Sequence, residues 1–158
     1  MFYTMNKLSL AIVLLAFSCA CNNTDKKTND GNKEFQVLAD SLEHEVMDGH
    51  NVGMAKYGKL TAMQNEAERL LDSIAKLPAK AREAMTPLKI KLDGLVEQLR
   101  SAKSGMDKWM DEYNMDSAVN NIEQRIKYLT SEKIKVSNIK EAILNSLQKA
   151  DSVLKARF

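Results

Sequence analysis

The chain of 158 residues has few residues that break helices or brace small folds: two Pro, six Gly and two Cys. Both cysteines, Cys19 and Cys21, lie near the N-terminus, so the rest of the chain has no thiol for a disulfide or a cysteine metal site. Positive and negative charges nearly cancel, leaving a formal net charge of +2. Nucleic-acid binding needs a basic stripe, so we predict no nucleic-acid partner.

Motifs of known active sites are also missing from the sequence. It has no Gly-rich phosphate loop, no H-E-x-x-H zinc motif and no nucleophile elbow. The run Glu43-His44-Glu45 makes no catalytic group, because neighbouring residues on a helix point in different directions. We therefore predict that the protein is not an enzyme and has no catalytic residue.

An apolar run near the N-terminus is too short to cross a membrane. A basic residue precedes the ten-residue run Leu8–Phe17, and a spanning helix needs roughly 20 residues, so the run suits a signal peptide. Small residues then surround Cys19 and Cys21, in a pattern that resembles the lipobox of bacterial lipoproteins. There a lipid is attached to the thiol and the preceding peptide is removed. Met5 is an alternative start to Met1, since a complete signal peptide follows it.

Two cysteines compete for the lipid. Cys21 follows Ala20 and precedes a polar stretch, whereas Cys19 follows Ser18, and neither has the upstream Leu of most lipoboxes. We favour Cys21, because cleavage before it leaves no spare thiol in the mature chain. The alternatives are ordinary secretory cleavage and a membrane stub. The covalent lipid is the only attached group that we expect.

The first 33 residues then divide into two parts: 1–20 is the signal peptide, and 21–33 is a disordered polar tether rich in Asn, Thr, Asp and Lys. Several acyl chains on one cysteine would hold the protein stably at a membrane. We expect it in the cell envelope, anchored in the outer membrane and facing the periplasm or the cell surface. The sequence leaves this orientation and the oligomeric state open.

From Glu34 onward, apolar residues recur in alternating steps of three and four, the spacing of helices that pack side by side. This spacing predicts helices at about 34–77, 86–113 and 116–156, with a short helical turn between the first two. Pro78 ends the first helix, Thr86 caps the second, and Asp116 caps the third. The third seam includes Val119, and Ile134 and Ile139 widen it. The predicted fold is all-α: an elongated, coiled-coil-like antiparallel bundle of three helices.

Helical spacing also groups residues that can bind a metal ion. Met47, His50 and Met54 share one face of the first helix, and thioethers with imidazole suit Cu(I). The interpretation that we favour is core packing, because Met is a flexible filler of cores. Further methionines and two aspartates would add ligands to such a site: Met85, Met106, Met110, Met115, Asp107 and Asp111.

Two more features have a structural and a functional interpretation. Gly49 and Gly53 lie four residues apart, on a face where another backbone could approach. We expect close packing against the Trp109 region there, because a large indole needs space opposite it. The alternatives are that the glycines kink the helix or leave a ligand groove. Trp109 and Tyr113 close the second helix, either as a plug at one end of the bundle or as a contact for a partner protein. We favour the plug.

Three segments resemble a family of short Bacteroidota lipoproteins, some of which carry the label "viral A-type inclusion protein". They are EVMDGHNVGMAKYGKL (45–60), MDKWMDEYN (106–114) and YLTSEKIKVSNIKEAILNSLQKADSVL (128–154). The resemblance implies a lipid anchor and no viral function, and it carries over no catalytic residue. Relatives often have an acidic residue and a Pro where this chain has Asn51 and Ala55, which argues against a ligand role for the His50 segment.

These observations give one leading function and two alternatives. The leading hypothesis is a non-enzymatic helical lipoprotein that binds or spaces other envelope components. The first alternative is a periplasmic copper binder that uses His and Met side chains. The second is a holdase-like periplasmic chaperone, suggested by the Met-rich helix faces and the glycines.

Overall fold

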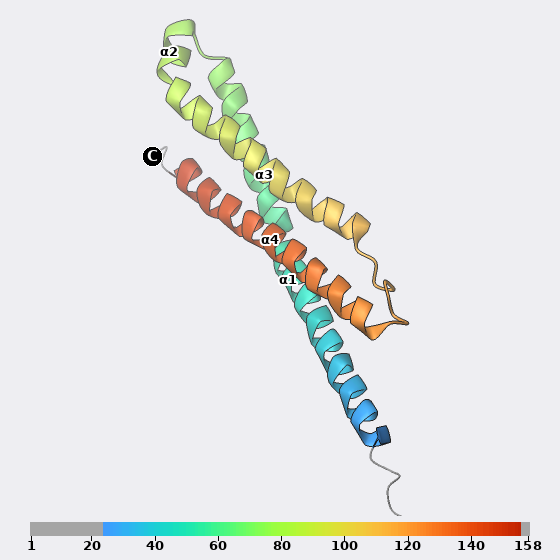
Figure 1. Ribbon diagram of the computed structural model, residues 1–158. Helices are drawn as coiled ribbons and strands as arrows, with labels where there is room; N and C mark the ends of the chain where they lie inside the picture. Colours follow the sequence, from blue (N-terminus) through green and yellow to red (C-terminus); the bar gives the residue numbers. More distant parts are fainter. Residues whose placement is uncertain (1–23, 156–158) are drawn as a thin grey trace, which may run out of the picture.

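The computed structural model describes residues 24–155, with side chains from residue 31 on. These residues form four helices: α1 (Thr24–Ala75), α2 (Ala79–Ala84), α3 (Thr86–Glu112) and α4 (Ile122–Lys155). The three long helices pack against one another in an elongated rod, and α2 turns the chain between α1 and α3 at the far end (Figure 1). α1 and α4 run in the same direction and α3 runs in the opposite one, which confirms the predicted all-α bundle.

The turn at the far end follows from Pro78. α1 stops at Ala75, two residues before its predicted end, and Pro78 then takes the N-cap position of α2 with φ −56° and ψ 151°. The predicted helical turn between the long helices is thus confirmed. The predicted capping role of Thr86 is wrong, because Met85 occupies the cap position of α3 and no side chain bonds to the helix start.

The start of α1 differs from the sequence prediction. The helix begins at Thr24, so residues 24–33, predicted as part of a disordered tether, continue the helix. Extending an existing helix costs far less than starting one, because each added residue gains a hydrogen bond. A Cβ added at Gly31 would meet nothing within 4 Å, so this extension has no close neighbour there.

The start of α4 is a second correction. Asp116 was predicted to cap this helix, but its backbone N–H bonds to the side chain of Asn114 (2.9 Å) within a run of turns. The cap is Asn121, whose Oδ1 accepts a hydrogen bond from the Gln124 N–H (3.0 Å). Val119, predicted in the seam, is 58% exposed in the turn segment 113–121. Short polar side chains that bond to their own backbone favour turns over helix here.

The core lies where the three long helices face one another. On α3, every predicted seam residue from Leu92 to Trp109 is buried. On α4 the apolar seam is confirmed from Leu129 to Leu154, and Ile139 packs against the core, but Ile134 is 58% exposed and does not widen the buried stripe. The fully buried side chains with the largest volume are Leu60, Leu92, Leu95, Leu99, Met106, Leu129, Ile143, Val46 and Val136.

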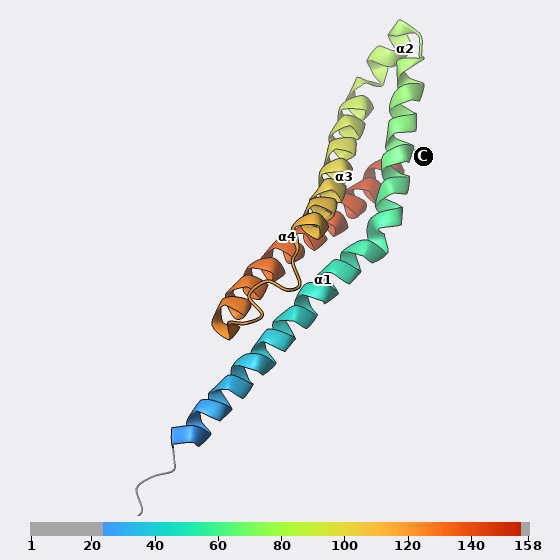
Figure 2. The same ribbon diagram turned by 90° about the vertical axis from the view of Figure 1, so that its right-hand side faces the viewer.

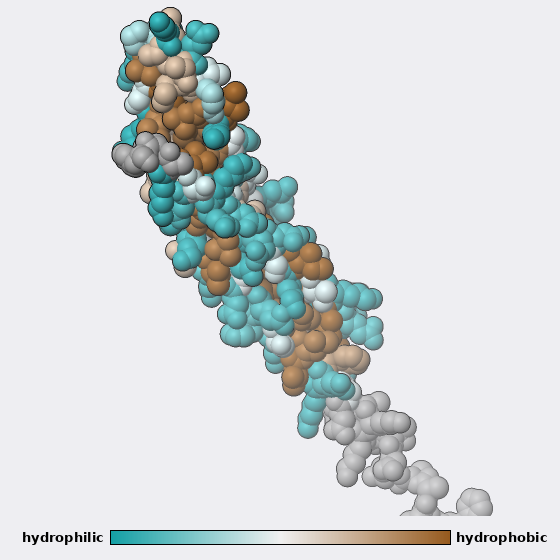
Figure 3. Space-filling model, turned by 90° about the vertical axis from the view of Figure 1, so that its left-hand side faces the viewer, coloured by the Kyte–Doolittle hydropathy of each residue, from teal (hydrophilic) through white to brown (hydrophobic). Residues whose placement is uncertain are grey.

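The surface of the rod is mostly polar. Figure 2 shows α1 changing direction part-way along its length, and Figure 3 shows apolar side chains gathered towards both ends of the face that it presents. Among residues 24–155, no helix combines the length and the apolar character that crossing a membrane requires.

Candidate functional site

An aromatic cluster joins the three long helices where α3 ends. His50 comes from α1, Trp109 from α3, Tyr113 from the C-cap of α3 and Tyr128 from α4. The ring centroids lie 5.6 Å apart for His50 and Trp109, 4.8 Å for Trp109 and Tyr113, and 6.1 Å for Tyr113 and Tyr128. Rings at these separations attract one another and exclude water from the space between them. The rings therefore form one column across the bundle.

A buried carboxylate satisfies the polar group of the largest ring. Trp109 is 4% exposed, and its Nε1 donates a hydrogen bond of 2.9 Å to Oε2 of Glu132. Lys135 donates to the other oxygen of that carboxylate at 2.7 Å. This hydrogen bond raises the pKa of Lys135. An ionised carboxylate is tolerated inside a bundle only when it is bonded in this way.

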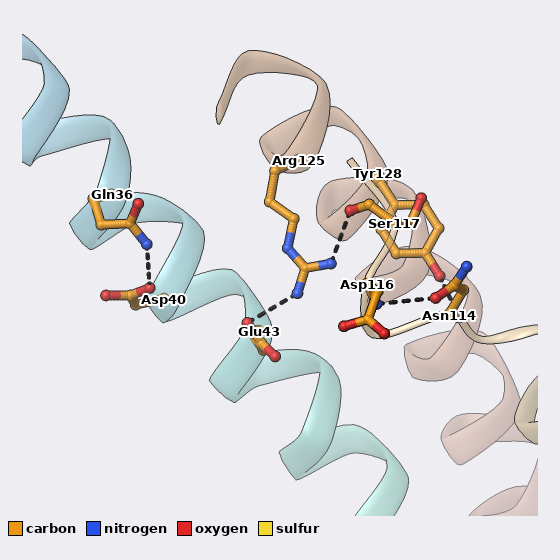
Figure 4. Close-up of polar contacts among 8 residues, drawn as sticks. All are labelled: Gln36, Asp40, Glu43, Asn114, Asp116, Ser117, Arg125 and Tyr128. Carbon is orange, nitrogen blue, oxygen red and sulfur yellow. Dashed lines mark hydrogen bonds and ion pairs between the residues drawn. The ribbon is translucent and has the colours of Figure 1, made fainter. Parts of the chain in front are cut away.

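Arg125 holds the turn segment against α1. The arginine is 7% exposed, and its guanidinium donates to Oε2 of Glu43 and to the backbone oxygen of Ser117, each at 3.0 Å (Figure 4). Next to it, the hydroxyl of Tyr128 accepts the backbone N–H of Asn114 at 2.8 Å. The segment between α3 and α4 is thus fixed to both α1 and α4. This arrangement therefore holds the loop in place.

Tyr113 is the one residue of the column whose packing includes an unfavourable feature. Its hydroxyl oxygen is buried and has no hydrogen-bond partner in the described part of the chain. Burial raises the pKa of Tyr113, and the negative charge of Glu43 adds to this effect. An unpaired buried hydroxyl costs stability, of the order of 1–3 kcal/mol. The aromatic rings therefore pack the bundle together, but one of them buries a hydroxyl group without a hydrogen bond.

The predicted partner contact through Trp109 does not fit this burial. The indole is inside the bundle, and Tyr113 is half-buried against it. The two side chains close the α3 end of the bundle, which is the plug interpretation. A partner protein would have to contact exposed residues around them.

The metal candidates Met47, His50 and Met54 lie half-buried on α1. The His50 ring is tilted against Trp109, its Nδ1 lies 3.1 Å from the side-chain oxygen of Asn51, and Met54 packs against the core. Within residues 24–155, no group of three or more His, Cys, Asp or Glu side chains is placed to hold a metal ion. Copper binding through the methionine thioethers and His50 stays a prediction.

The glycines of α1 let α3 and α4 approach closely. A Cβ at Gly53 would lie 2.3 Å from Cε of Met106 and 3.3 Å from Ile143, and one at Gly49 would lie 3.0 Å from Val136. Met106 is fully buried, so it has little room to move away. The close approach predicted at these glycines is thus present, although the groups that approach are Met106, Val136 and Ile143 and not Trp109.

One half-buried hydrogen bond couples α1 to α3. The hydroxyl of Tyr57 donates to Oδ1 of Asp107 at 2.5 Å, and Nζ of Lys103 lies 5.3 Å from the centre of the tyrosine ring. The hydrogen bond to the carboxylate raises the pKa of Tyr57 to about 12, with smaller contributions from burial and from the charge of Asp107.

Two charged residues of this region, Glu132 and Arg125, were not predicted from the sequence. A signal for Glu132 existed: it lies three residues after Leu129 and four before Val136, on the apolar stripe of α4. A carboxylate there needs a buried donor, and the single Trp of the chain supplies one. Arg125 had no such signal, because its partners belong to another helix and to a loop backbone.

The lipidation candidates Cys21 and Cys19 lie outside the described residues, as does the predicted signal peptide. Comparisons of the chain with protein families, with curated proteins and with solved structures find no match.

Proposed function

We propose that the protein is a lipid-anchored component of the cell envelope whose helical domain binds or spaces other envelope components without catalysing a reaction. The observation that carries the proposal is the length of α1. This helix begins three residues after Cys21 and continues for 52 residues. At 1.5 Å per residue it is about 78 Å long. A lipid on Cys21 would thus attach the rod at one end and hold α2 far from the membrane.

The interior of the bundle supports a binding or spacing role. Its buried charged side chains in the described residues, Arg125 and Glu132, are used in bonds between structural elements. Glu132 accepts hydrogen bonds from Trp109 and Lys135, so each oxygen of its carboxylate has a donor inside the protein. A general base needs a free carboxylate or imidazole beside an open cleft. Contacts with other molecules are therefore assigned to the surface of the rod.

The test of anchoring is metabolic labelling with an alkyne-bearing fatty acid in cells that produce the full chain. We expect the wild-type protein and the Cys19→Ser variant to incorporate the label and to fractionate with membranes. The Cys21→Ser variant should incorporate none and should leave the membrane fraction. Absence of label from the wild-type protein would contradict the anchor, and loss of label only in Cys19→Ser would move it to Cys19.

The test of binding is photo-crosslinking in the same cells. A photoreactive amino acid replaces exposed Lys80 on α2 or, as a matched control, exposed Lys127 near the start of α4. We expect a reproducible crosslinked envelope protein from the α2 position that is lost in the Cys21→Ser background. If neither position captures a reproducible partner, the spacing role fails.

A further inference from the structure

A groove lies between α3 and α4 near the α2 end of the rod. Its volume is about 640 Å³, within the range of small-molecule sites. Apolar side chains line much of it: Pro87, Leu88 and Ile90 from the first turns of α3, and Val153 from the last turn of α4. Ile90 is 66% exposed, and Figure 3 shows apolar surface near the α2 end of the rod.

Two lysines line the same groove. Lys91 comes from α3 and Lys149 from α4, and neither has an ion pair within the described part of the chain. The neighbouring carboxylates are bonded to other lysines: Asp93 lies 2.6 Å from Lys89, and Asp151 lies 3.0 Å from Lys59. No acidic residue lines the groove. The groove thus combines apolar walls with two unneutralised positive charges.

Gly94 deepens the groove. It lies inside α3, and a Cβ added there would meet nothing within 4 Å. Glycine inside a helix costs about 1 kcal/mol relative to Ala, and no close neighbour of Gly94 in the described residues requires it. Gly53 differs, because Met106 occupies the space beside it. The missing side chain at Gly94 leaves its space to the groove.

We propose that this groove binds an anionic amphiphile, with its apolar chain along Leu88, Gly94 and Val153 and its anionic head between Lys91 and Lys149. Apolar walls favour a hydrocarbon chain, and two unpaired ammonium groups favour a carboxylate or phosphate head. The binding does not depend on the lipid anchor, since all of the groove lies in α2, α3 and α4.

A small amphiphile fits these walls better than an acidic helix does. A docked helix needs an apolar seam that repeats over several of its turns. The apolar lining that α4 contributes is confined to the half-buried Val153, and Ser152 and Lys149 are its polar neighbours. A single hydrocarbon chain needs only one such short apolar track.

The test uses the full chain in phosphatidylcholine vesicles and a ten-carbon fatty acid that carries a photoreactive diazirine. After irradiation, the labelled residues are mapped and quantified. We expect labelling to concentrate on residues 84–94 and 149–153. A control probe with the same ten-carbon tail and diazirine but a cationic trimethylammonium head should label these residues weakly. The Cys21→Ser variant should be labelled like the wild type, which keeps this result separate from the question of anchoring.

Two variants and their matched controls complete the test. Gly94→Leu fills the groove and should lower labelling there roughly tenfold, which corresponds to about 1.4 kcal/mol. Its control is Gly58→Leu, since Gly58 also has open space beside it but lies outside the groove. The double charge reversal Lys91→Glu with Lys149→Glu should lower labelling of the groove by a similar factor. Its control is the double variant Lys56→Glu with Lys127→Glu, which makes the same change of charge outside the groove and should leave the labelling unchanged.

Several outcomes would overturn the proposal. They are uniform labelling of the rod, equal labelling by the cationic probe, and labelling that neither Gly94→Leu nor the lysine reversal lowers. Competition by an acidic amphipathic peptide, but not by unlabelled decanoate, would assign the groove to a protein partner and would also overturn it.

Discussion

The indole N–H of Trp109 on α3 donates a hydrogen bond of 2.9 Å to Glu132 on α4, and both side chains are buried. The bond places a charged residue inside a bundle whose other interior residues are almost all apolar. Such a pair specifies how two helices align, because a shift of either helix would leave the buried indole N–H without its acceptor and Oε2 of the buried carboxylate without its donor. The alignment of α3 with α4 therefore depends on this contact.

The first prediction concerns that pair. Glu132→Ala removes the acceptor and leaves the indole N–H buried and unpaired, so we expect a loss of about 1–3 kcal/mol in the free energy of unfolding. Urea unfolding followed by circular dichroism measures it. Glu141→Ala is the control on the same helix, because Glu141 is exposed, and its effect should stay within about 0.5 kcal/mol.

A double-mutant cycle with Trp109→Phe isolates the pair itself. If the hydrogen bond matters, the cost of Glu132→Ala should be smaller in the Trp109→Phe background, with a coupling above about 0.5 kcal/mol. Additive costs would show that the two side chains act independently and would contradict the proposed alignment.

The second prediction concerns the turn segment 113–121. Arg125→Ala removes the guanidinium that binds Glu43 and the Ser117 carbonyl, so we expect a loss of about 1.5–3 kcal/mol, as for hydrogen bonds to charged groups. Amide hydrogen exchange should rise in residues 113–121 more than in the middle of α3. Arg125→Lys should recover only part of the lost free energy of unfolding, since a lysine lacks the planar guanidinium that bonds to both partners at once. Unchanged exchange in the segment would show that Arg125 is not the clamp.

The third prediction uses the glycines of α1. Gly58→Ala meets nothing within 4 Å and should stabilise the helix by about 0.5–1 kcal/mol, because Ala favours helix over Gly. Gly53→Ala should instead destabilise the protein, because its Cβ would collide with the buried Met106. Thermal unfolding of both variants gives the comparison.

Removing the colliding group provides the check on Gly53. Met106→Ala is destabilising by itself, yet adding Gly53→Ala to it should cost little or should stabilise, because Cε of Met106 is then absent. If Gly53→Ala costs the same in both backgrounds, steric contact with Met106 is not the reason for the glycine.

The fourth prediction concerns the titration of Tyr57. Its pKa of about 12 in the folded chain lies above the ordinary value of 10.0. The hydroxyl of the unfolded chain therefore ionises first as the pH rises. The contribution of the protonated Tyr57 hydroxyl to the free energy of unfolding is therefore fully present below pH 10.0 and is lost as the pH rises through the folded-state pKa of about 12. Difference absorbance titration of wild type against Tyr57→Phe measures it, and Asp107→Ala should return the pKa towards 10. An ordinary pKa in the wild type would contradict the hydrogen bond to Asp107.

Much of this fold follows from local rules. The steps of three and four on α3 predict its buried face from Leu92 to Trp109 except for Val96, because a helix repeats its faces regularly. Pro78 predicts the turn at the α2 end, because a proline has no backbone N–H to donate and so ends a helix. Such patterns depend only on residues close in sequence.

The rest depends on contacts between distant residues. The start of α4 was misplaced at Asp116 because several Asn and Asp side chains in this stretch can cap a helix equally well. In the structure, Arg125 bonds both to the backbone of Ser117 in the turn segment and to Glu43 on α1. Glu43 lies 82 positions from Arg125 in the sequence, so local patterns do not reveal this contact. The groove could not be predicted either, since it requires knowing that Gly94 and Lys149 lie on facing helices.

We propose above that a lipid on Cys21 fixes one end of this rod to a membrane. The most direct test is the mass of the N-terminal peptide of the protein isolated from membranes of cells that produce it. We expect a peptide that begins at Cys21 and carries the mass of the attached acyl chains. A peptide that begins at Met1 or Met5, or a Cys21 with a free thiol, would contradict it.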